Sequence, residues 1–129
     1  MRENFADFVE NLRDSGILIA LATSNTWEQT DKILEAVGLE EVFDVVTTGD
    51  EVTFNKPDPD IFTMTADKLG VERDGCLVIE DSPAGIEAAR RAGMKVVGIA
   101  SEGNYQELRK ADIVVESFSE ITPQAVDQL

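Results

Sequence analysis

Two adjacent carboxylates, Glu80 and Asp81, stand where an apolar run ends and helix signals begin. Neighbouring acids repel each other unless a cation offsets their charge, and Mg²⁺ is a hard ion that takes carboxylate and water oxygens. The pair is therefore a candidate magnesium site. The alternatives are an ordinary polar turn, or a role for Asp81 in neutralising the N-terminus of the next helix.

Phosphate-binding donors stand at comparable places in the chain. Thr23, Ser24 and Asn25 follow one apolar run, and Lys56 precedes a helix. Hydroxyl and amide donors at a helix start bind phosphate oxygens, and a lysine offsets the charge on those oxygens. Together with magnesium carboxylates, these groups predict phosphoryl-transfer chemistry. Taken singly, Thr23 and its neighbours are good turn and cap residues, and Lys56 is a solvated loop lysine.

Hydrophobic periodicity predicts the elements that would position these residues. Cap signals mark several helix starts, because Thr26 and Gln29 form a capping box, and Asp58 and Ser82 each precede a proline at the first helical position. Continuous apolar runs, typical of strands covered on both faces, lie between the helices. The expected helices are 5–12, 26–38, 58–70, 82–93 and 104–111 with a turn at 123–128, and the expected strands are 17–22, 44–47, 76–80, 95–100 and 112–115.

The alternation of strands and helices predicts an α/β fold. Such a chain forms a mainly parallel sheet between two layers of helices, here as a single domain over residues 1–129. Ligands of an open parallel sheet bind beyond the carboxyl ends of its strands. We therefore expect the hydroxyl, the lysine and the two carboxylates to meet at one edge of the sheet.

Three segments of this chain, "LATSN", "NKPDPDIF" and "IEDSPAGIEAARRAGM", resemble motifs of the haloacid dehalogenase superfamily in order and spacing. The similarity is strongest to the branch of β-phosphoglucomutase and phosphoglycolate phosphatase. It implies a three-layer α/β/α, Rossmann-like core and a Mg²⁺-dependent phosphatase or phosphomutase acting on small phosphorylated metabolites, of the sugar phosphate or phosphoglycolate type. The resemblance assigns the phosphate-binding hydroxyl to Thr23, positions near the phosphate to Ser24 and Asn25, the motif lysine to Lys56, and magnesium carboxylates to Asp81 and Glu80.

The family's first motif, an Asp-x-Asp-Gly-Thr-like segment that carries the nucleophilic aspartate, does not occur in this chain. The one Asp-x-Asp sequence is Asp58-Pro59-Asp60, which belongs to the lysine motif. By this resemblance we expect the chain to begin after the nucleophile strand and the helical cap, and to be inactive alone. The alternatives are a non-catalytic phosphate- or metal-binding module and half of a split enzyme. A receiver-like domain is disfavoured because no acidic cluster lies near the N-terminus.

The resemblance also places the missing strand between strands 17–22 and 76–80. We expect the gap to close by direct pairing of these two strands, or to be filled by an N-terminal segment or a second chain, because an empty slot would leave the core unpacked.

Composition excludes several partners. Eleven Lys and Arg against 26 Asp and Glu give a net charge of −15, which repels nucleic acids and anionic membranes. The absence of histidine excludes it as a base or metal ligand, and one cysteine allows no internal disulfide. No apolar run reaches membrane-spanning length, so we expect a cytoplasmic protein. The resemblance implies that its partner is a small phosphorylated substrate.

Overall fold

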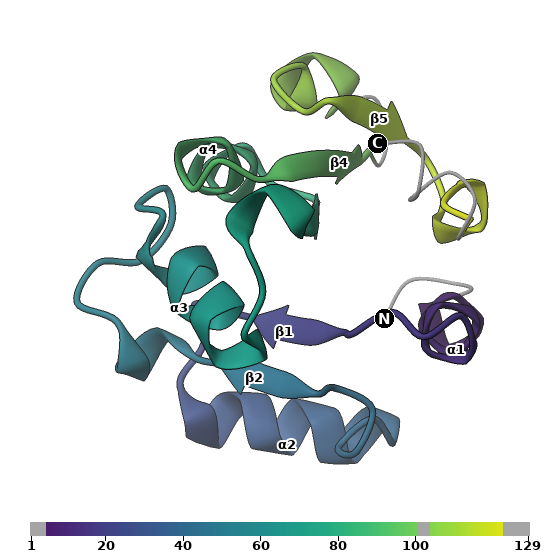
Figure 1. Ribbon diagram of the computed structural model, residues 1–129, viewed down its shortest axis with the longest axis vertical. Helices are drawn as coiled ribbons and strands as arrows, with labels where there is room; N and C mark the ends of the chain where they lie inside the picture. The colour runs from purple at the N-terminus through teal and green to yellow at the C-terminus, as the bar shows by residue number, and fades with distance from the viewer. Residues whose placement is uncertain (1–4, 101–103, 123–129) are drawn as a thin grey trace.

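A computed structural model of the chain describes residues 5–100 and 104–122. Helices and strands alternate in the predicted order (Figure 1). None of the helices in this part of the chain is long and apolar enough to cross a membrane. The helices are α1 (Phe5–Asp14), α2 (Trp27–Val37), α3 (Asp60–Leu69) and α4 (Pro83–Arg91), the strands are β1 (Ala20–Ala22), β2 (Val45–Thr47), β3 (Leu77–Glu80), β4 (Lys95–Ile99) and β5 (Ile113–Val115), and short 3₁₀ helices span Gly49–Glu51, Arg73–Gly75, Asn104–Leu108 and Phe118–Glu120.

Side-chain caps start α2 and α4 where the sequence predicts them. In α2 the Gln29 amide donates to the Thr26 hydroxyl at 3.2 Å, and the Thr26 amide donates to the Gln29 side chain at 3.0 Å. In α4 the Gly85 amide donates to the Ser82 hydroxyl at 3.1 Å. Each capped amide is one that a helix leaves without an internal partner. Both predicted helix starts are therefore confirmed.

Three segments differ from the prediction in detail. Helix α3 begins at Asp60, so Pro59 and not the predicted Asp58 is its N-cap; the Asp58 carboxylate accepts from the Asp60 amide at 3.1 Å. Strand β1 covers the end of the expected strand 17–22, and the segment that follows residue 103 begins as a 3₁₀ helix rather than an α-helix. The turn expected at 123–128 lies outside the described residues.

Parallel strands lie between two layers of helices. Every described ladder is parallel: β1 pairs with β2, and β3, β4 and β5 pair in that order. Along β4, Val96 packs into the cluster that holds α3 and α4, whereas Val97 and Ile99 pack with α1. Successive side chains of a strand point to opposite faces, so α1 covers one face and α3 with α4 cover the other. The predicted α/β class is confirmed.

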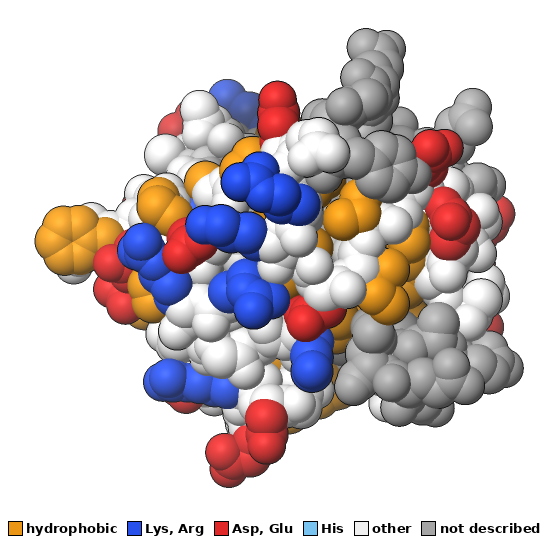
Figure 2. Space-filling model, turned by 90° about the horizontal axis from the view of Figure 1, so that it is seen from above, with side chains coloured by type: hydrophobic (Ala, Val, Ile, Leu, Met, Phe, Trp, Pro, Cys, Tyr) orange, Lys and Arg blue, Asp and Glu red, His pale blue; other side chains and the backbone are white. Residues whose placement is uncertain are grey.

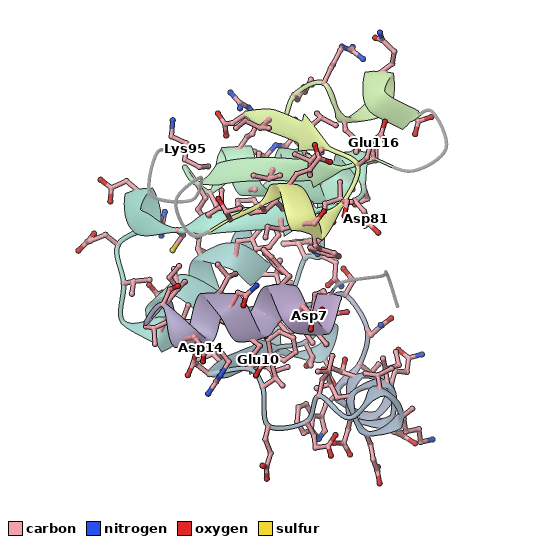
Figure 3. The ribbon with its side chains drawn as sticks, turned by 90° about the vertical axis from the view of Figure 1, so that its right-hand side faces the viewer. Asp7, Glu10, Asp14, Asp81, Lys95 and Glu116 are labelled. Atoms are coloured by element: carbon pink, nitrogen blue, oxygen red, sulfur yellow. The ribbon has the colours of Figure 1, made fainter. Side chains whose placement is uncertain are left out.

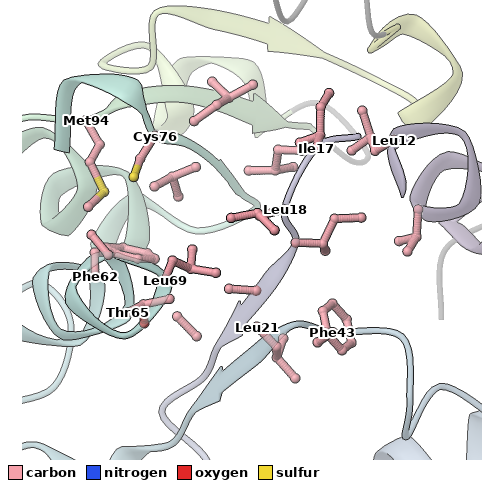
Figure 4. Close-up of a pocket in the computed structure, with 18 of the residues that line it drawn as sticks. Leu12, Ile17, Leu18, Leu21, Phe43, Phe62, Thr65, Leu69, Cys76 and Met94 are labelled. Carbon is pink, nitrogen blue, oxygen red and sulfur yellow. The ribbon is translucent and has the colours of Figure 1, made fainter. Parts of the chain in front are cut away.

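An open slot separates β1 from β3. No ladder joins these strands in the described part of the chain, and a cavity of about 490 Å³ lies between them (Figure 4). We call the space between β1 and β3 the strand slot. The expectation that the two strands pair directly is therefore wrong. The physical reason is α3, which packs on β1 and β2 while its Ile61 and Phe62 share a core cluster with Val78 of β3, and so holds the two edges apart.

Charged side chains occupy the outside of the helices. Figure 3 shows Asp7, Glu10 and Asp14 along α1. Figure 2, in which the molecule is viewed from the top of Figure 1, shows Lys and Arg side chains gathered on that face.

On α4, Arg91 lies 3.1 Å from Glu87. The hydrogen bond from Arg91, followed by the charge of Lys110, lowers the pKa of Glu87. Exposed pairs of this kind contribute little to stability.

Replacement of Ile61 by alanine tests the role of α3 in the core. Ile61 is fully buried, with an exposed fraction of 0%, so Ile61→Ala should lower the free energy of unfolding by about 2–5 kcal/mol. Ile33 on α2 is 51% exposed, and Ile33→Ala should change the same quantity by less than about 0.5 kcal/mol. Denaturant unfolding measures both, and equal losses would contradict the packing described for α3.

Candidate active site

A lysine and a glutamate join the carboxyl ends of the two sheets. Lys56, in the loop before α3, places its Nζ 2.6 Å from Oε2 of Glu80, the last residue of β3. The same Nζ donates to the carbonyl of Ala22, the last residue of β1, at 3.2 Å. The two charged side chains are only 14% and 10% exposed, so solvent screens their attraction weakly. Lys56 and Glu80 therefore meet at the sheet edge where the sequence places them.

The second carboxylate oxygen of Glu80 is also engaged. Oε1 accepts from the Asp81 amide at 3.2 Å and from the Ser82 hydroxyl at 3.3 Å. Gly85 makes room for this carboxylate, because a Cβ on Gly85 would lie 2.0 Å from Cδ of Glu80. Glycine is unfavourable within a helix, and this was the sequence signal for a close approach at the start of α4. Glu80 is thus held between Lys56 and the first turn of α4.

Asp81 has a different environment. Its side chain is exposed and has no hydrogen-bond or ion-pair partner among the described residues. Figure 3 shows Asp81 and Lys95 toward opposite ends of the sheet of β3 and β4, as expected for a residue that follows the carboxyl end of β3. Among the described residues, no group of three or more acidic, cysteine or histidine side chains is arranged so that it could hold a metal ion. A cation at this edge would therefore find one uncommitted carboxylate, Asp81, and one shared with Lys56.

The predicted phosphate-binding loop forms a tight turn after β1. The half-buried Thr23 donates its amide to the Thr47 carbonyl at 3.0 Å, and its hydroxyl accepts from the Asn25 amide at 3.2 Å. The Asn25 amide is therefore occupied within the turn, whereas the Ser24 amide has no partner among the described residues. Of the two amides predicted to bind phosphate, that of Ser24 is the available one.

The 3₁₀ turn Gly49–Glu51, which the sequence did not identify, fixes the position of this loop. The Gly49 amide donates to the Asn25 carbonyl at 2.7 Å. A Cβ on Gly49 would lie 2.1 Å from the Ser24 carbonyl oxygen, which no side chain allows. The Asp50 carboxylate accepts from the amide of Trp27, the first residue of α2, at 3.1 Å. A glycine two residues after the end of the strand 44–47 was the available sequence signal.

Two carboxylates of this turn are stabilised in their charged form. A hydrogen bond from the Thr48 hydroxyl, and then that from the Trp27 amide, lowers the pKa of Asp50. The hydrogen bond from Lys68, followed by that from the Thr48 amide, lowers the pKa of Glu51. These contacts tie the turn to α2 and α3.

Gly49→Ala should destabilise the protein, because the new methyl group must displace the Ser24 carbonyl. Such forced shifts cost typically about 1–3 kcal/mol. Gly75→Ala is the matched control, since a Cβ on Gly75 would meet nothing within 4 Å. Denaturant unfolding of both variants measures the difference, and equal stability of the two would rule out the close approach.

The lowered pKa of Glu51 predicts a pH dependence. A carboxyl whose folded-state pKa lies below its ordinary value of 4.5 stabilises the fold above that pH and loses the contribution as the pH falls through the folded-state pKa. Glu51→Gln should therefore flatten the acid side of the melting-temperature profile, whereas Glu10→Gln on the exposed face of α1 should leave it unchanged. Thermal unfolding below neutral pH provides the measurement, and identical profiles for wild type and Glu51→Gln would contradict the assignment.

Comparison with known proteins agrees with this geometry. A validoxylamine A 7'-phosphate phosphatase of Streptomyces hygroscopicus subsp. limoneus is 30% identical over 115 residues, which are 89% of this chain and 54% of that protein. The crystal structure of CbbY from Rhodobacter sphaeroides in complex with phosphate superimposes with a TM-score of 0.89 at 30% identity, covering 98% of this chain and 58% of that one. For β-phosphoglucomutase from Clostridium difficile the TM-score is 0.87 at 30% identity, with coverage of 97% and 54%.

The chain thus spans about half the length of the relatives that it matches. The family model of the haloacid dehalogenase-like hydrolases matches residues 1–99. The parallel strands, and the meeting of Lys56 and Glu80 at their carboxyl edge, are consistent with that match. The chain belongs to the haloacid dehalogenase-like hydrolase family.

Proposed function

We propose that this chain is the core of a Mg²⁺-dependent phosphatase or phosphomutase that acts on small phosphorylated metabolites, of the sugar phosphate or phosphoglycolate type, in the cytoplasm. The observation that carries the proposal is the contact between Lys56 and Glu80 at the carboxyl edge, next to the Thr23 turn. The names of the phosphatase, of the phosphate complex and of the phosphomutase among the similar proteins support this substrate class.

Each residue has a role that follows from its surroundings. The Thr23 hydroxyl and the Ser24 amide would donate to phosphate oxygens, with Asn25 at the rim of the same turn. Lys56 would offset the charge of those oxygens, and Glu80 holds the ammonium group in place at 2.6 Å. These groups bind and orient a phosphoryl group, which is the larger part of catalysis in phosphoryl transfer.

The donor set fits Mg²⁺ in part. Asp81 fits, because its carboxylate is exposed and uncommitted in the described part of the chain. Glu80 remains a predicted ligand whose Oε2 is shared with Lys56. Mg²⁺ is commonly held by one or two carboxylates together with substrate phosphate and water, and when bound it supplies positive charge that offsets the phosphoryl oxygens.

We propose that the nucleophile is supplied by polypeptide other than these 129 residues. Asp58 accepts from the amide of Asp60, the first residue of α3. Neither Asp58 nor Asp60 follows a strand. Covalent transfer needs a nucleophile in line with the leaving oxygen. A non-catalytic phosphate-binding module is the second candidate, favoured by the absence of a third acidic ligand among the described residues.

The 129-residue chain alone should not hydrolyse 4-nitrophenyl phosphate in the presence of magnesium. Loss of a nucleophile costs on the order of 10⁶ in rate. Fusion of a segment with an Asp-x-Asp-Gly-Thr strand and a cap should restore magnesium-dependent turnover, and Lys56→Ala or Asp81→Ala should then abolish it. Release of 4-nitrophenol measures the rate.

If the unfused chain turns over the ester and Asp81→Ala stops it, the nucleophile lies within this chain and the proposal fails. If the fusion binds inorganic phosphate without turnover, the chain is a binding module.

A further inference from the structure

Lysine and arginine gather on one part of this acidic chain. Residues 87–112 hold five of its 11 Lys and Arg but only four of its 26 Asp and Glu. All five cations are exposed, and we call them the basic face: Arg90, Arg91, Lys95, Arg109 and Lys110. Figure 2 shows Lys and Arg side chains together on the side of the molecule where α4, β4 and β5 lie in Figure 1. Positive charge is therefore segregated from the acids that dominate the rest of the chain.

Contacts between three segments build the basic face. Lys95 is the first residue of β4, and Asp112 directly precedes β5. The Asp112 amide donates to the Val96 carbonyl at 2.9 Å, and the Asp112 side chain accepts from the Val96 amide at 2.8 Å. Arg90, near the end of α4, lies 3.7 Å from the other carboxylate oxygen of Asp112. The end of α4, the start of β4 and the segment before β5 therefore meet at the amino edge of this sheet.

The basic face lies away from the candidate active site. Glu80 ends β3 and pairs in register with Gly98, near the carboxyl end of β4. Lys95 begins the same strand. Figure 3 shows Lys95 and Asp81 toward opposite ends of the sheet, with the Lys95 side chain directed away from the molecule. The basic face is therefore a separate surface.

Carboxylates of the chain itself already bind to the basic face. Glu87 lies between two cations, with Arg91 at 3.1 Å from one of its oxygens and Lys110 at 3.6 Å from the other. The hydrogen bond from Arg91, and then the charge of Lys110, hold the pKa of Glu87 below its ordinary value. The pair between Arg90 and Asp112 is a second instance. Carboxylate is therefore a group that these cations accept.

Two cations of the basic face have no carboxylate partner among residues 5–100 and 104–122. The Lys95 side chain makes no hydrogen bond or ion pair within these ranges, and Arg109 donates to the Gln106 carbonyl at 3.0 Å. Arg90 and Arg91 lie in the last turn of α4, where a cation interacts favourably with the helix C-terminus. That effect does not account for Lys95 or Arg109. Their charge is available to a partner from outside.

The layout of these charges selects the class of partner. Small molecules bind in concave sites, whereas these side chains are spread over the exposed ends of three segments. An extended polypeptide carries acidic side chains at intervals along such a surface, and the arginine fork matches a carboxylate. A nucleic acid would run past the basic face onto the rest of the chain, where six Lys and Arg stand against 22 Asp and Glu. That surface repels phosphates.

We propose that the basic face binds a short acidic segment of another protein, whose Asp or Glu side chains pair with Lys95 and Arg109 beside Glu87 and Asp112. At physiological salt the Debye length is about 8 Å, so acids elsewhere on the chain oppose such a segment only weakly. A second copy of this chain is a poorer partner, because a net charge of −15 on each copy opposes association. The proposal does not depend on the phosphoryl chemistry of the candidate active site.

The test is an NMR titration of the 129-residue chain with an acidic peptide. The probe is an acetylated and amidated run of about six glutamates, which spans about 20 Å when extended. At low salt, where charges act over longer distances, the backbone amides of the basic face should shift to saturation, and those of Thr23 and Ser24 should not. A glutamine peptide of the same length should cause no shift. Slow exchange of the Val96 and Val97 amides reports that β4 is folded in each sample.

Variants with the same change in net charge provide the matched comparison. Lys95→Glu should weaken binding of the glutamate peptide about tenfold, because it replaces an attraction with a repulsion, and Arg109→Glu should have a similar effect. Lys32→Glu on α2, where the lysine side chain is 74% exposed, should change the dissociation constant less than about twofold.

Equal weakening by Lys95→Glu and Lys32→Glu would show that net charge alone drives binding, and would overturn the proposal. The proposal is also wrong if no amide shifts to saturation, or if the shifts fall on Thr23 and Ser24. Tighter binding of an oligodeoxythymidine of the same charge, or sedimentation showing that the chain covers this face by dimerising, identifies a different partner and overturns it too. Fast exchange throughout β4 of the unmodified chain would show that the basic face does not form, with the same consequence.

Discussion

The ion pair between Lys56 and Glu80 is the interaction on which the rest of the structure depends. It joins two sheets that share no ladder in the described part of the chain. Helix α3 packs between the two sheets and sets the distance between them. Lys56 links their carboxyl ends, because its ammonium group contacts both Ala22 and Glu80. Removal of one partner would leave the other charge in a poorly solvated place, which costs more than the loss of an exposed pair.

The same pair constrains the candidate site. The Glu80 carboxylate accepts hydrogen bonds from Lys56, the Asp81 amide and the Ser82 hydroxyl. A cation that binds Glu80 would therefore have to share its oxygens with these donors. Asp81 remains exposed and has no side-chain partner among residues 5–100 and 104–122. The two carboxylates therefore have different roles. Glu80 positions the ammonium group of Lys56, and Asp81 is the carboxylate that remains available to a cation. The strand slot lies between β1 and β3, whose carboxyl ends Lys56 contacts at this site.

Local signals predicted much of this structure. The helix caps at Thr26 and Ser82 depend only on residues three positions away, and the structure confirms both predicted caps. The common edge of Lys56 and Glu80 followed from the rule that carboxyl ends of parallel strands meet. The contact of Gly49 with Ser24, and the failure of β1 to pair with β3, were not predictable. Both depend on how distant segments approach each other, and α3, not the strands, sets the distance between the edges.

A double-mutant cycle on Lys56→Met and Glu80→Gln, read as the free energy of unfolding in denaturant, tests most directly whether this pair joins the two sheets. Each single variant leaves one partner without its counterpart, so the double variant should lose less stability than the sum of the two single losses. The expected coupling lies in the range of about 0.5–3 kcal/mol for residues in contact. Losses that add within about 0.3–0.5 kcal/mol would show that the two residues do not act together, and the sheets would then be held by α3 alone.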